Sequence, residues 1–243
     1  AFVDIGFEKN AFLHYWDIIP SPLDSSYDVV DRGRRKKEKP RITNKDIPKK
    51  YPTGTELTVQ VTKGPIGTKG PRVTTNVLLP GRYLVLLPNS EQSGVSRKIE
   101  NREERARLKK IVQELSIPEG MGVIIRTAGQ GQRKGYFIRD LAILLQTWEG
   151  VTNRVKTQKA GTCVFEEPDL IERTVRDFLT EDVERIVVDN AAETERVTKL
   201  IGRISKRSLE KVQLYPHSEP IFDRFGVTRQ LETAYTRKVM LPS

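Results

Sequence analysis

The stretch EGMGVIIRTAG, residues 119–129, places an arginine and a threonine directly after a short apolar run. The run from Gly122 to Ile125 lies between glycines and predicts a short buried strand. Burying a guanidinium or a hydroxyl at the end of such a strand is costly unless a partner meets it. Arg126 and Thr127 therefore have three possible environments: a structural ion pair, a solvated strand end, or an anion. A phosphate would suit the planar donors of arginine.

The composition favours an anionic partner. The 243 residues carry 42 Lys and Arg against 32 Asp and Glu, a formal net charge of +10. A balance this basic indicates nucleic acid first and an anionic membrane surface second. The length allows one large domain or two to three small ones, and the 37% hydrophobic content fits several small cores. No apolar run approaches the length needed to span a bilayer.

Donors for metal or disulfide chemistry are scarce. Cys163 is the single cysteine, which excludes an internal disulfide and a cysteine-rich zinc site, and we expect it to be a small buried residue. His14 and His217 are far apart in the sequence, which disfavours a histidine metal site. This cysteine usage fits a reducing cytoplasm. The chain begins inside an apparent strand and stops just after another apolar alternation, so we expect a fragment cut at both ends.

Periodicity predicts a mixture of strands and helices. Strands are predicted by alternation or short apolar runs at 1–18 (a hairpin), 55–79, 81–89 and 122–129. Helices are predicted at 96–115 and 136–158, and the second should bury a stripe of Ile138, Leu141, Ala142, Leu145 and Trp148. Beyond Cys163, helices alternate with strands at 184–190 and 211–216, which suggests a separate α/β unit.

The densest basic run lies in a polar, proline-bearing stretch after the first hairpin. It comprises Arg32, Arg34, Arg35, Lys36, Lys37 and Lys39. Such a run is usually a solvated loop, and the same loop can attract phosphate. Both interpretations remain open.

The order of several motifs resembles the ribonuclease E/G family, bacterial and plastid endoribonucleases that process and degrade RNA. The motifs are AFVDIG, NAFL, TKGPRVTTNVLLPGRYLVLLPN, GVSRKIE, EGMGVIIRTAG, VFEEPDLIERTVRDFL, ERIVVDN and KVMLPS. Each motif alone is weak evidence, but their order from one end of the chain to the other is hard to obtain by chance.

The resemblance implies an α+β fold of several subdomains. An OB-fold β-barrel that binds RNA, without its first strands, would occupy residues 1–75, and a 5′-sensor α/β subdomain would occupy 76–170. An incomplete ribonuclease H-like α/β subdomain would follow at 171–235. Residues 236–243 would begin a DNase I-like subdomain.

The resemblance also implies a site for the 5′-terminal monophosphate of RNA. Arg126 would be a charge-assisted donor to the phosphate, and Thr127 would donate through its hydroxyl and backbone. Gly81, Val85 and Arg97 match further positions of this sensor. Gly81 would permit close approach of the backbone, and Val85 would give the terminal base an apolar surface.

A second set of residues matches RNA-contacting positions of the OB-fold. The rings of Phe2 and Phe12 would stack on bases, and the ammonium of Lys69 would meet phosphate. The alternative is that both phenylalanines are core residues of the sheet. Ile5 stands where relatives often carry an aromatic residue, whereas Phe7 lies two positions further on.

The catalytic centre that the family implies is not in this sequence. It consists of two aspartates of the DNase I-like subdomain that bind Mg²⁺, which helps water attack the phosphodiester. These aspartates would follow Ser243, and neither Asp4 nor Asp189 sits in that motif. We expect this chain to bind single-stranded RNA without cutting it and without holding Mg²⁺ or zinc. The full-length enzyme would be a cytoplasmic, Mg²⁺-dependent endoribonuclease able to form a homo-oligomer.

Two other interpretations are kept. The chain could be a freestanding, non-catalytic RNA-binding module. It would differ from a fragment of the endoribonuclease in one respect, whether the gene continues into the metal-binding aspartates. It could also be a basic scaffold protein that attaches to ribosomes or membranes through residues 32–39. Deleting that loop would then abolish binding, and replacing Arg126 would not.

Overall fold

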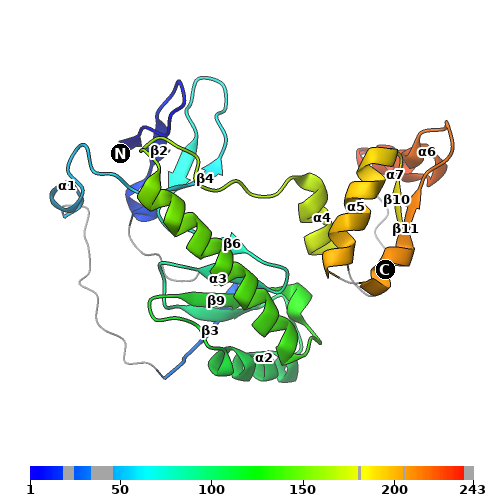
Figure 1. The fold of residues 1–243 in the computed structure, drawn as a ribbon, viewed down its shortest axis with the longest axis horizontal. Helices are drawn as coiled ribbons and strands as arrows, with labels where there is room; N and C mark the ends of the chain where they lie inside the picture. The colour runs from blue at the N-terminus through cyan, green and yellow to red at the C-terminus, as the bar shows by residue number, and fades with distance from the viewer. Residues whose placement is uncertain (19–24, 34–45, 180–181, 205, 238–243) are drawn as a thin grey trace. The chain divides into compact units, whose positions relative to one another are not determined.

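The computed structural model describes the chain apart from residues 19–24, 34–45, 180–181, 205 and 238–243 (Figure 1). The chain divides into two compact units, residues 1–167 and 168–243. Both contain helices and strands, which confirms the mixed α+β class. Most of the basic run, from Arg34 to Lys39, and the motif KVMLPS lie outside the described residues.

The first sheet of residues 1–167, called here the N-terminal sheet, has the strand order β1-β2-β5-β4. Its strands are β1 (Phe2–Val3), β2 (Ala11–Leu13), β4 (Gln60–Lys63) and β5 (Arg72–Thr74). Phe2 pairs antiparallel with Phe12, which confirms the predicted hairpin. Ala11, Leu13 and Val73 form a small core on one face. Because side chains alternate along a strand, Phe12 and Arg72 lie on the opposite, exposed face.

Two short helical segments lie between the strands of the N-terminal sheet in the sequence. The 3₁₀ turn η1 (Tyr15–Asp17) follows β2 directly, and α1 (Ile47–Lys50) precedes β4. The carbonyl of Asp17 accepts hydrogen bonds from the backbone N–H of Thr75 (2.9 Å) and from its hydroxyl (2.8 Å). These bonds tie η1 to the end of β5.

The second sheet, called here the central sheet, has the strand order β3-β8-β9-β7-β6. Its strands are β3 (Tyr27–Val30), β6 (Leu79–Pro80), β7 (Leu84–Leu87), β8 (Ser93–Ser96) and β9 (Gly122–Ile125). The middle strand, β9, runs parallel to β8 and antiparallel to β7. The strand predicted around Gly122–Ile125 is thus confirmed, and all of its residues are buried.

Helices α2 (Arg102–Glu114) and α3 (Lys134–Thr157) share one hydrophobic core with the central sheet. Figure 1 shows α3 running diagonally across this sheet. The helix α2 begins at Asn101, whose side-chain oxygen accepts a hydrogen bond from the N–H of Glu104 (2.9 Å), a typical N-cap. The predicted face of α2, which includes Leu108 and Ile111, is buried.

The predicted stripe of α3 was wrong in part. Ile138 is 51% exposed and Ala142 is exposed, whereas Leu141 is buried. The buried residues of this helix are Phe137, Asp140, Leu141, Leu144 and Val151. The error has a simple cause, because apolar residues surround much of the helix and the 3.6-residue period alone does not select one face.

Two strands of the central sheet were not predicted. β3 lies in the polar stretch interpreted as a loop, within the range expected for the OB-fold, yet it pairs antiparallel with β8. The strand β8 has the sequence SGVS, and its last residue was predicted to begin a helix. Its small and polar residues carry little of the pattern that marks a strand, and pairing with β3 and β9 together with burial of Val95 stabilises it.

Residues 168–243 form an α/β unit, as predicted. Strands β10 (Ile186–Val188) and β11 (Val212–Leu214) are parallel. Helical segments surround them in the sequence: α4 (Leu170–Phe178), α5 (Ala191–Ile204), η3 (Lys206–Lys211), α6 (Ile221–Arg224) and α7 (Val227–Ala234). Their core contains Val175, Leu179, Val197 and Ile201. Among the described helices of the chain, none is long and apolar enough to cross a bilayer.

The unit also has a charged clamp between two helices. Asp169 caps α4 by accepting the N–H of Glu172 (3.0 Å), and it pairs with the guanidinium of Arg196 on α5. The hydrogen bonds from Glu172 and then Arg196 hold the pKa of the Asp169 carboxyl below its ordinary value. Because all three side chains are well exposed, we expect this clamp to contribute little to stability.

The tight packing of β9 generates a stability prediction. A Cβ at Gly122 would lie 1.8 Å from the carbonyl oxygen of Gln92 and 2.7 Å from that of Ser90, both backbone atoms. We expect Gly122→Ala to lower the free energy of unfolding by about 1–3 kcal/mol. The matched control is Gly150→Ala in α3, where a Cβ meets nothing within 4 Å and helix propensity should improve. Denaturant unfolding measures both, and equal stability of the two variants would contradict the packing described.

Candidate functional site

The predicted sensor residues come together where the inner strands of the central sheet end. This side of the sheet, at the carboxyl ends of β8 and β9, is called here its edge. Val95 of β8 lies opposite Ile125 of β9, and the two strands are parallel. The residues that follow them, Arg97 after β8 and Arg126 and Thr127 after β9, therefore leave the sheet at the same edge. Parallel neighbours are the reason why two motifs almost 30 residues apart in the sequence are placed together.

The turn between β6 and β7 reaches the same edge. Leu84 lies opposite Ile125 on the other side of β9, and the N–H of Arg126 donates to the carbonyl of Tyr83 (2.8 Å). The Arg126 guanidinium donates through Nη1 to the carbonyl of Gly81 (2.5 Å). Gly81, in turn, donates its N–H to the carbonyl of Leu84 (2.8 Å), which closes the turn.

A carboxylate on α3 holds this turn. Asp140 Oδ1 accepts the N–H of Arg82 (3.1 Å), and its Oδ2 accepts those of Tyr83 (2.8 Å) and Leu84 (2.8 Å). Asp140 is only 8% exposed, so the carboxylate replaces the water that these three N–H groups would otherwise bind. The turn is therefore fixed by a residue more than 50 positions away in the sequence.

The packing of this turn also explains one glycine. A Cβ at Gly81 would lie 2.7 Å from Asp140 Oδ2 and 2.9 Å from Leu144 Cδ1. The absence of a side chain at Gly81 allows the β6–β7 turn to pack closely against α3. Val85 follows in β7 and is half-buried, between the buried Leu84 and Leu86. Alternation along the strand places Val85 on the face opposite the helices, the same face as Ile124, its partner on β9.

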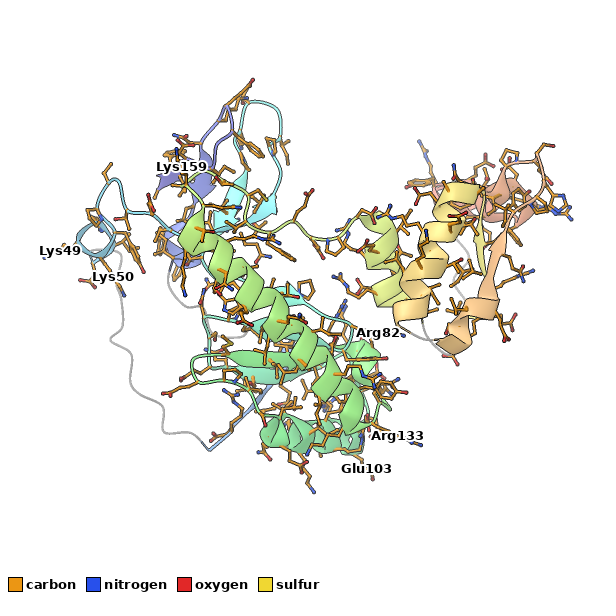
Figure 2. All side chains as sticks on the ribbon, in the orientation of Figure 1. Lys49, Lys50, Arg82, Glu103, Arg133 and Lys159 are labelled. Atoms are coloured by element: carbon orange, nitrogen blue, oxygen red, sulfur yellow. The ribbon has the colours of Figure 1, made fainter. Side chains whose placement is uncertain are left out.

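A further cation of this edge was not predicted. Arg82, labelled in Figure 2, belongs to the β6–β7 turn. Its guanidinium lies 5.3 Å from the centre of the Tyr83 ring. Arg133, also labelled there, precedes α3 and is exposed. Arg82, Arg97 and Arg126 all lie on segments that meet at this edge, which favours an anionic ligand. The charge of Arg97 also acts on Asp28 of β3. An arginine next to Gly81 in the turn was the available signal.

The loop after Arg126 is held by an ion pair on α2. Residues Thr127–Gly129 form a 3₁₀ turn, η2. Glu104 accepts two hydrogen bonds from the Arg107 guanidinium (2.7 Å each) and one from the N–H of Gly131 (2.8 Å). The bond from Arg107 is the main reason why the pKa of the Glu104 carboxyl is lowered, with burial acting in the opposite direction.

The exposed face of the N-terminal sheet holds the second predicted set. Phe2 is 74% exposed and Phe12 is 40% exposed, and their ring centres are 5.8 Å apart in an edge-on arrangement. The alternative in which both are core residues is therefore wrong. Lys69 is exposed on the turn between β4 and β5, so it is on the surface but on a different element. Ile5 packs against the core, whereas Phe7 is 61% exposed.

The expected environment of Cys163 was wrong. Its side chain is exposed, because it lies in the extended segment between α3 and α4 and contributes to none of the hydrophobic clusters. In the described part of the chain, no group of three or more His, Cys, Asp or Glu residues could hold a metal ion. Asp4 accepts the N–H of Gly6 (2.9 Å), and Asp189 is exposed after β10. Neither of these two aspartates belongs to such a group.

Comparison with known proteins gives a consistent set of similarities. The model of the ribonuclease E/G family matches residues 78–243. Ribonuclease G of Escherichia coli K12 is 38% identical over 243 residues, and ribonuclease G of Haemophilus influenzae is 37% identical. Ribonuclease E of E. coli K12 is 34% identical over 245 residues. All of this chain is covered, but it spans 48% of the ribonuclease G proteins and 22% of that ribonuclease E.

The three-way acceptance by Asp140 can be tested with asparagine. The side chain of the Asp140→Asn variant would keep one acceptor oxygen and place an NH₂ group against at least one backbone N–H. We expect this variant to lower the free energy of unfolding by about 1–3 kcal/mol, the cost of an unsatisfied buried donor. Asp189→Asn, at an exposed aspartate, is the matched control. If urea titration finds the two variants equally stable, Asp140 does not hold the turn.

The Glu104 ion pair predicts a pH dependence. The pKa of Glu104 in the folded chain is below the ordinary value of about 4.3. The pair's contribution is therefore present above pH ~4.3 and is lost as the pH falls through the folded pKa. We expect Glu104→Gln to be about 0.5 kcal/mol less stable than the wild type near pH 7, and this difference to become smaller near pH 3. Urea unfolding at both pH values measures this, and a difference that grows in acid would contradict it.

Proposed function

The chain belongs to the ribonuclease E/G family, and we propose that these 243 residues bind single-stranded RNA and sense its 5′-terminal monophosphate. The observation that carries this proposal is the convergence of the β6–β7 turn, Arg97 and the Arg126–Thr127 pair at one edge of the central sheet. RNA processing is the role that the names of the relatives support.

Arg126 is the proposed phosphate donor. Its guanidinium is oriented by the hydrogen bond to the Gly81 carbonyl, and its backbone by the bond to Tyr83. An oriented guanidinium loses less rotamer freedom when it donates to a phosphate than a mobile side chain does. A charge-assisted bond to a terminal phosphate is also among the stronger hydrogen bonds in proteins.

The neighbouring residues would complete the site. Thr127 is exposed next to Arg126 and offers a hydroxyl, while Arg97 adds a second guanidinium at the end of the neighbouring strand. Val85 offers an apolar surface one step inside the sheet, where the first base would lie. Gly81 contributes its carbonyl to Arg126 and, by lacking a side chain, lets the turn pack on α3.

The N-terminal sheet is the proposed RNA-binding surface for the rest of the strand. We assign residues 1–75, apart from β3 in the central sheet, to an OB-fold. In it, the exposed rings of Phe2 and Phe12 stack on bases and Lys69 meets phosphate. Residues 76–170 would be the 5′ sensor and 171–235 a ribonuclease H-like subdomain. Residues 236–243 would lead into a DNase I-like subdomain.

Hydrolysis is proposed for the whole protein. The relatives are named ribonucleases, and the resemblance implies a single-strand-specific endoribonuclease that uses Mg²⁺ in the cytoplasm, with a homo-oligomeric form. We assign no step of the hydrolysis to the described carboxylates. The 243 residues on their own would bind RNA without cutting it.

The proposal predicts a preference that depends on one guanidinium. We expect the wild-type chain to bind a short single-stranded RNA with a 5′-monophosphate about 10-fold more tightly than the same RNA with a 5′-hydroxyl. Arg126→Ala should abolish this preference and leave binding of the 5′-hydroxyl RNA nearly unchanged. Fluorescence anisotropy at one fixed salt concentration measures all four affinities.

Two further variants make the result specific. Arg229→Ala removes the same charge from an exposed position on α7 and should keep the preference. Arg126→Lys keeps the charge but not the planar donors, and it should retain only part of the preference for the 5′-monophosphate. A full preference in folded Arg126→Ala would refute the assignment of this residue.

A further inference from the structure

The exposed rings of the N-terminal sheet continue beyond the two phenylalanines. The ring of Phe12 lies 6.0 Å from that of His14, and the His14 ring lies nearly parallel to Trp16 at 6.4 Å. Phe2, Phe12, His14 and Trp16 thus form a continuous series, called here the aromatic row. Trp16, at its end, is 62% exposed.

Local structure fixes the direction of the aromatic row. β2 ends at Leu13, but the backbone of His14 is still extended, so its side chain lies on the same side as that of Phe12. The Nδ1 atom of His14 accepts the N–H of Trp16 (3.3 Å), which caps the turn η1. The carbonyl of Asp17 is bound by Thr75 at the end of β5. Trp16 is therefore held at the surface by an anchored turn, and Tyr15 packs beside it with ring centres 4.4 Å apart.

Cations accompany the aromatic row. Phe12 lies opposite Arg72 of β5, and Arg72 lies opposite Lys63 of β4. All three are exposed. Arg72 also forms an ion pair with Asp17 (2.9 Å), which places its charge near the turn that carries Trp16. A surface of flat rings with adjacent positive charge suits a ligand that has both bases and phosphates.

We propose that Trp16 is a further base-stacking position, so that the RNA strand crosses the aromatic row from Phe2 and Phe12 to Trp16. A large apolar side chain that stays mostly exposed, in line with other exposed rings, is typical of a binding surface. Indole offers the largest stacking face of the natural side chains. This inference rests on the proposed RNA binding of the N-terminal sheet and extends it to a longer stretch of RNA.

The chain provides its own spectroscopic probe. It contains 2 tryptophans, Trp16 and Trp148, and Trp148 packs against the core of the central sheet. In a Trp148→Phe background, Trp16 is the only tryptophan. We expect its fluorescence to be quenched when a single-stranded RNA of about ten nucleotides, within the span of one OB-fold, is added. A 5′-hydroxyl RNA is used, so that the signal does not depend on the 5′ sensor.

Leucine variants then measure the energetic effect without creating a polar surface. We expect Trp16→Leu to weaken binding of this RNA roughly 5-fold or more, and Phe12→Leu to weaken it by a similar factor. The matched control is Phe222→Leu, because Phe222 on α6 is 57% exposed and lies outside the aromatic row. This control should bind like the wild type. Circular dichroism and melting temperature verify that each variant is folded.

The outcomes separate this inference from the function on which it rests. If Phe12→Leu weakens binding while Trp16→Leu does not and no quenching occurs, RNA binding stands and the role of Trp16 is refuted. If both variants bind like the wild type, RNA binding by this sheet is refuted as well. An equal loss in Phe222→Leu would show that the effect is not specific to the row, and it would also overturn the inference.

Discussion

The Asp140 carboxylate accepts three consecutive backbone N–H groups, and the geometry of the candidate site depends on this arrangement. Without it, the β6–β7 turn would carry buried donors with no partner, each at a cost of about 1–3 kcal/mol. The β6–β7 turn then presents the Gly81 carbonyl to the guanidinium of Arg126. One acidic side chain thus orients a basic one through the backbone of the turn.

The two sheets of residues 1–167 differ in the charge and the exposure of their surface residues. At the edge of the central sheet, guanidinium groups gather around a rigid turn, which suits recognition of a single terminal group. On the N-terminal sheet, the exposed rings would, in the proposed function, stack on bases without selecting one of them, because every base has a face that can stack. A protein with both could hold a strand loosely along its length and sense its end specifically.

The sequence predicted those parts of the fold in which local pattern and final environment agree. The strand before Arg126 is an apolar run and lies in the middle of a sheet, and α2 buries its apolar face where the pattern indicates, although it begins at Arg102 rather than at residue 96. The pattern failed for β3, a short YDVV segment within a polar stretch, and for β8, whose SGVS sequence is mostly small and polar. It failed on α3 because apolar residues lie all around that helix. Cys163 was assigned by the average behaviour of cysteine, whereas its side chain lies outside the hydrophobic clusters.

The site residues show the same division. Arg126 and Thr127 could be singled out because a polar pair ended an apolar strand, and the family resemblance then supplied Gly81, Val85 and Arg97. Asp140 could not be found in this way, because an aspartate within a helix usually faces solvent. Nothing near it in the sequence indicates that its partners lie in a turn almost 60 residues earlier.

These long separations also govern when the site exists during synthesis. The Gly81 carbonyl is synthesised 45 residues before Arg126, which donates to it. The amide of Arg82 is synthesised 58 residues before its acceptor, Asp140. Contacts between distant residues form late, because the loop between them must close first. The aromatic surface is complete once Thr75 has anchored η1, whereas the edge of the central sheet also needs Arg126 and Asp140. A nascent chain can therefore form the aromatic surface first. During that interval it would hold RNA without distinguishing one 5′ end from another.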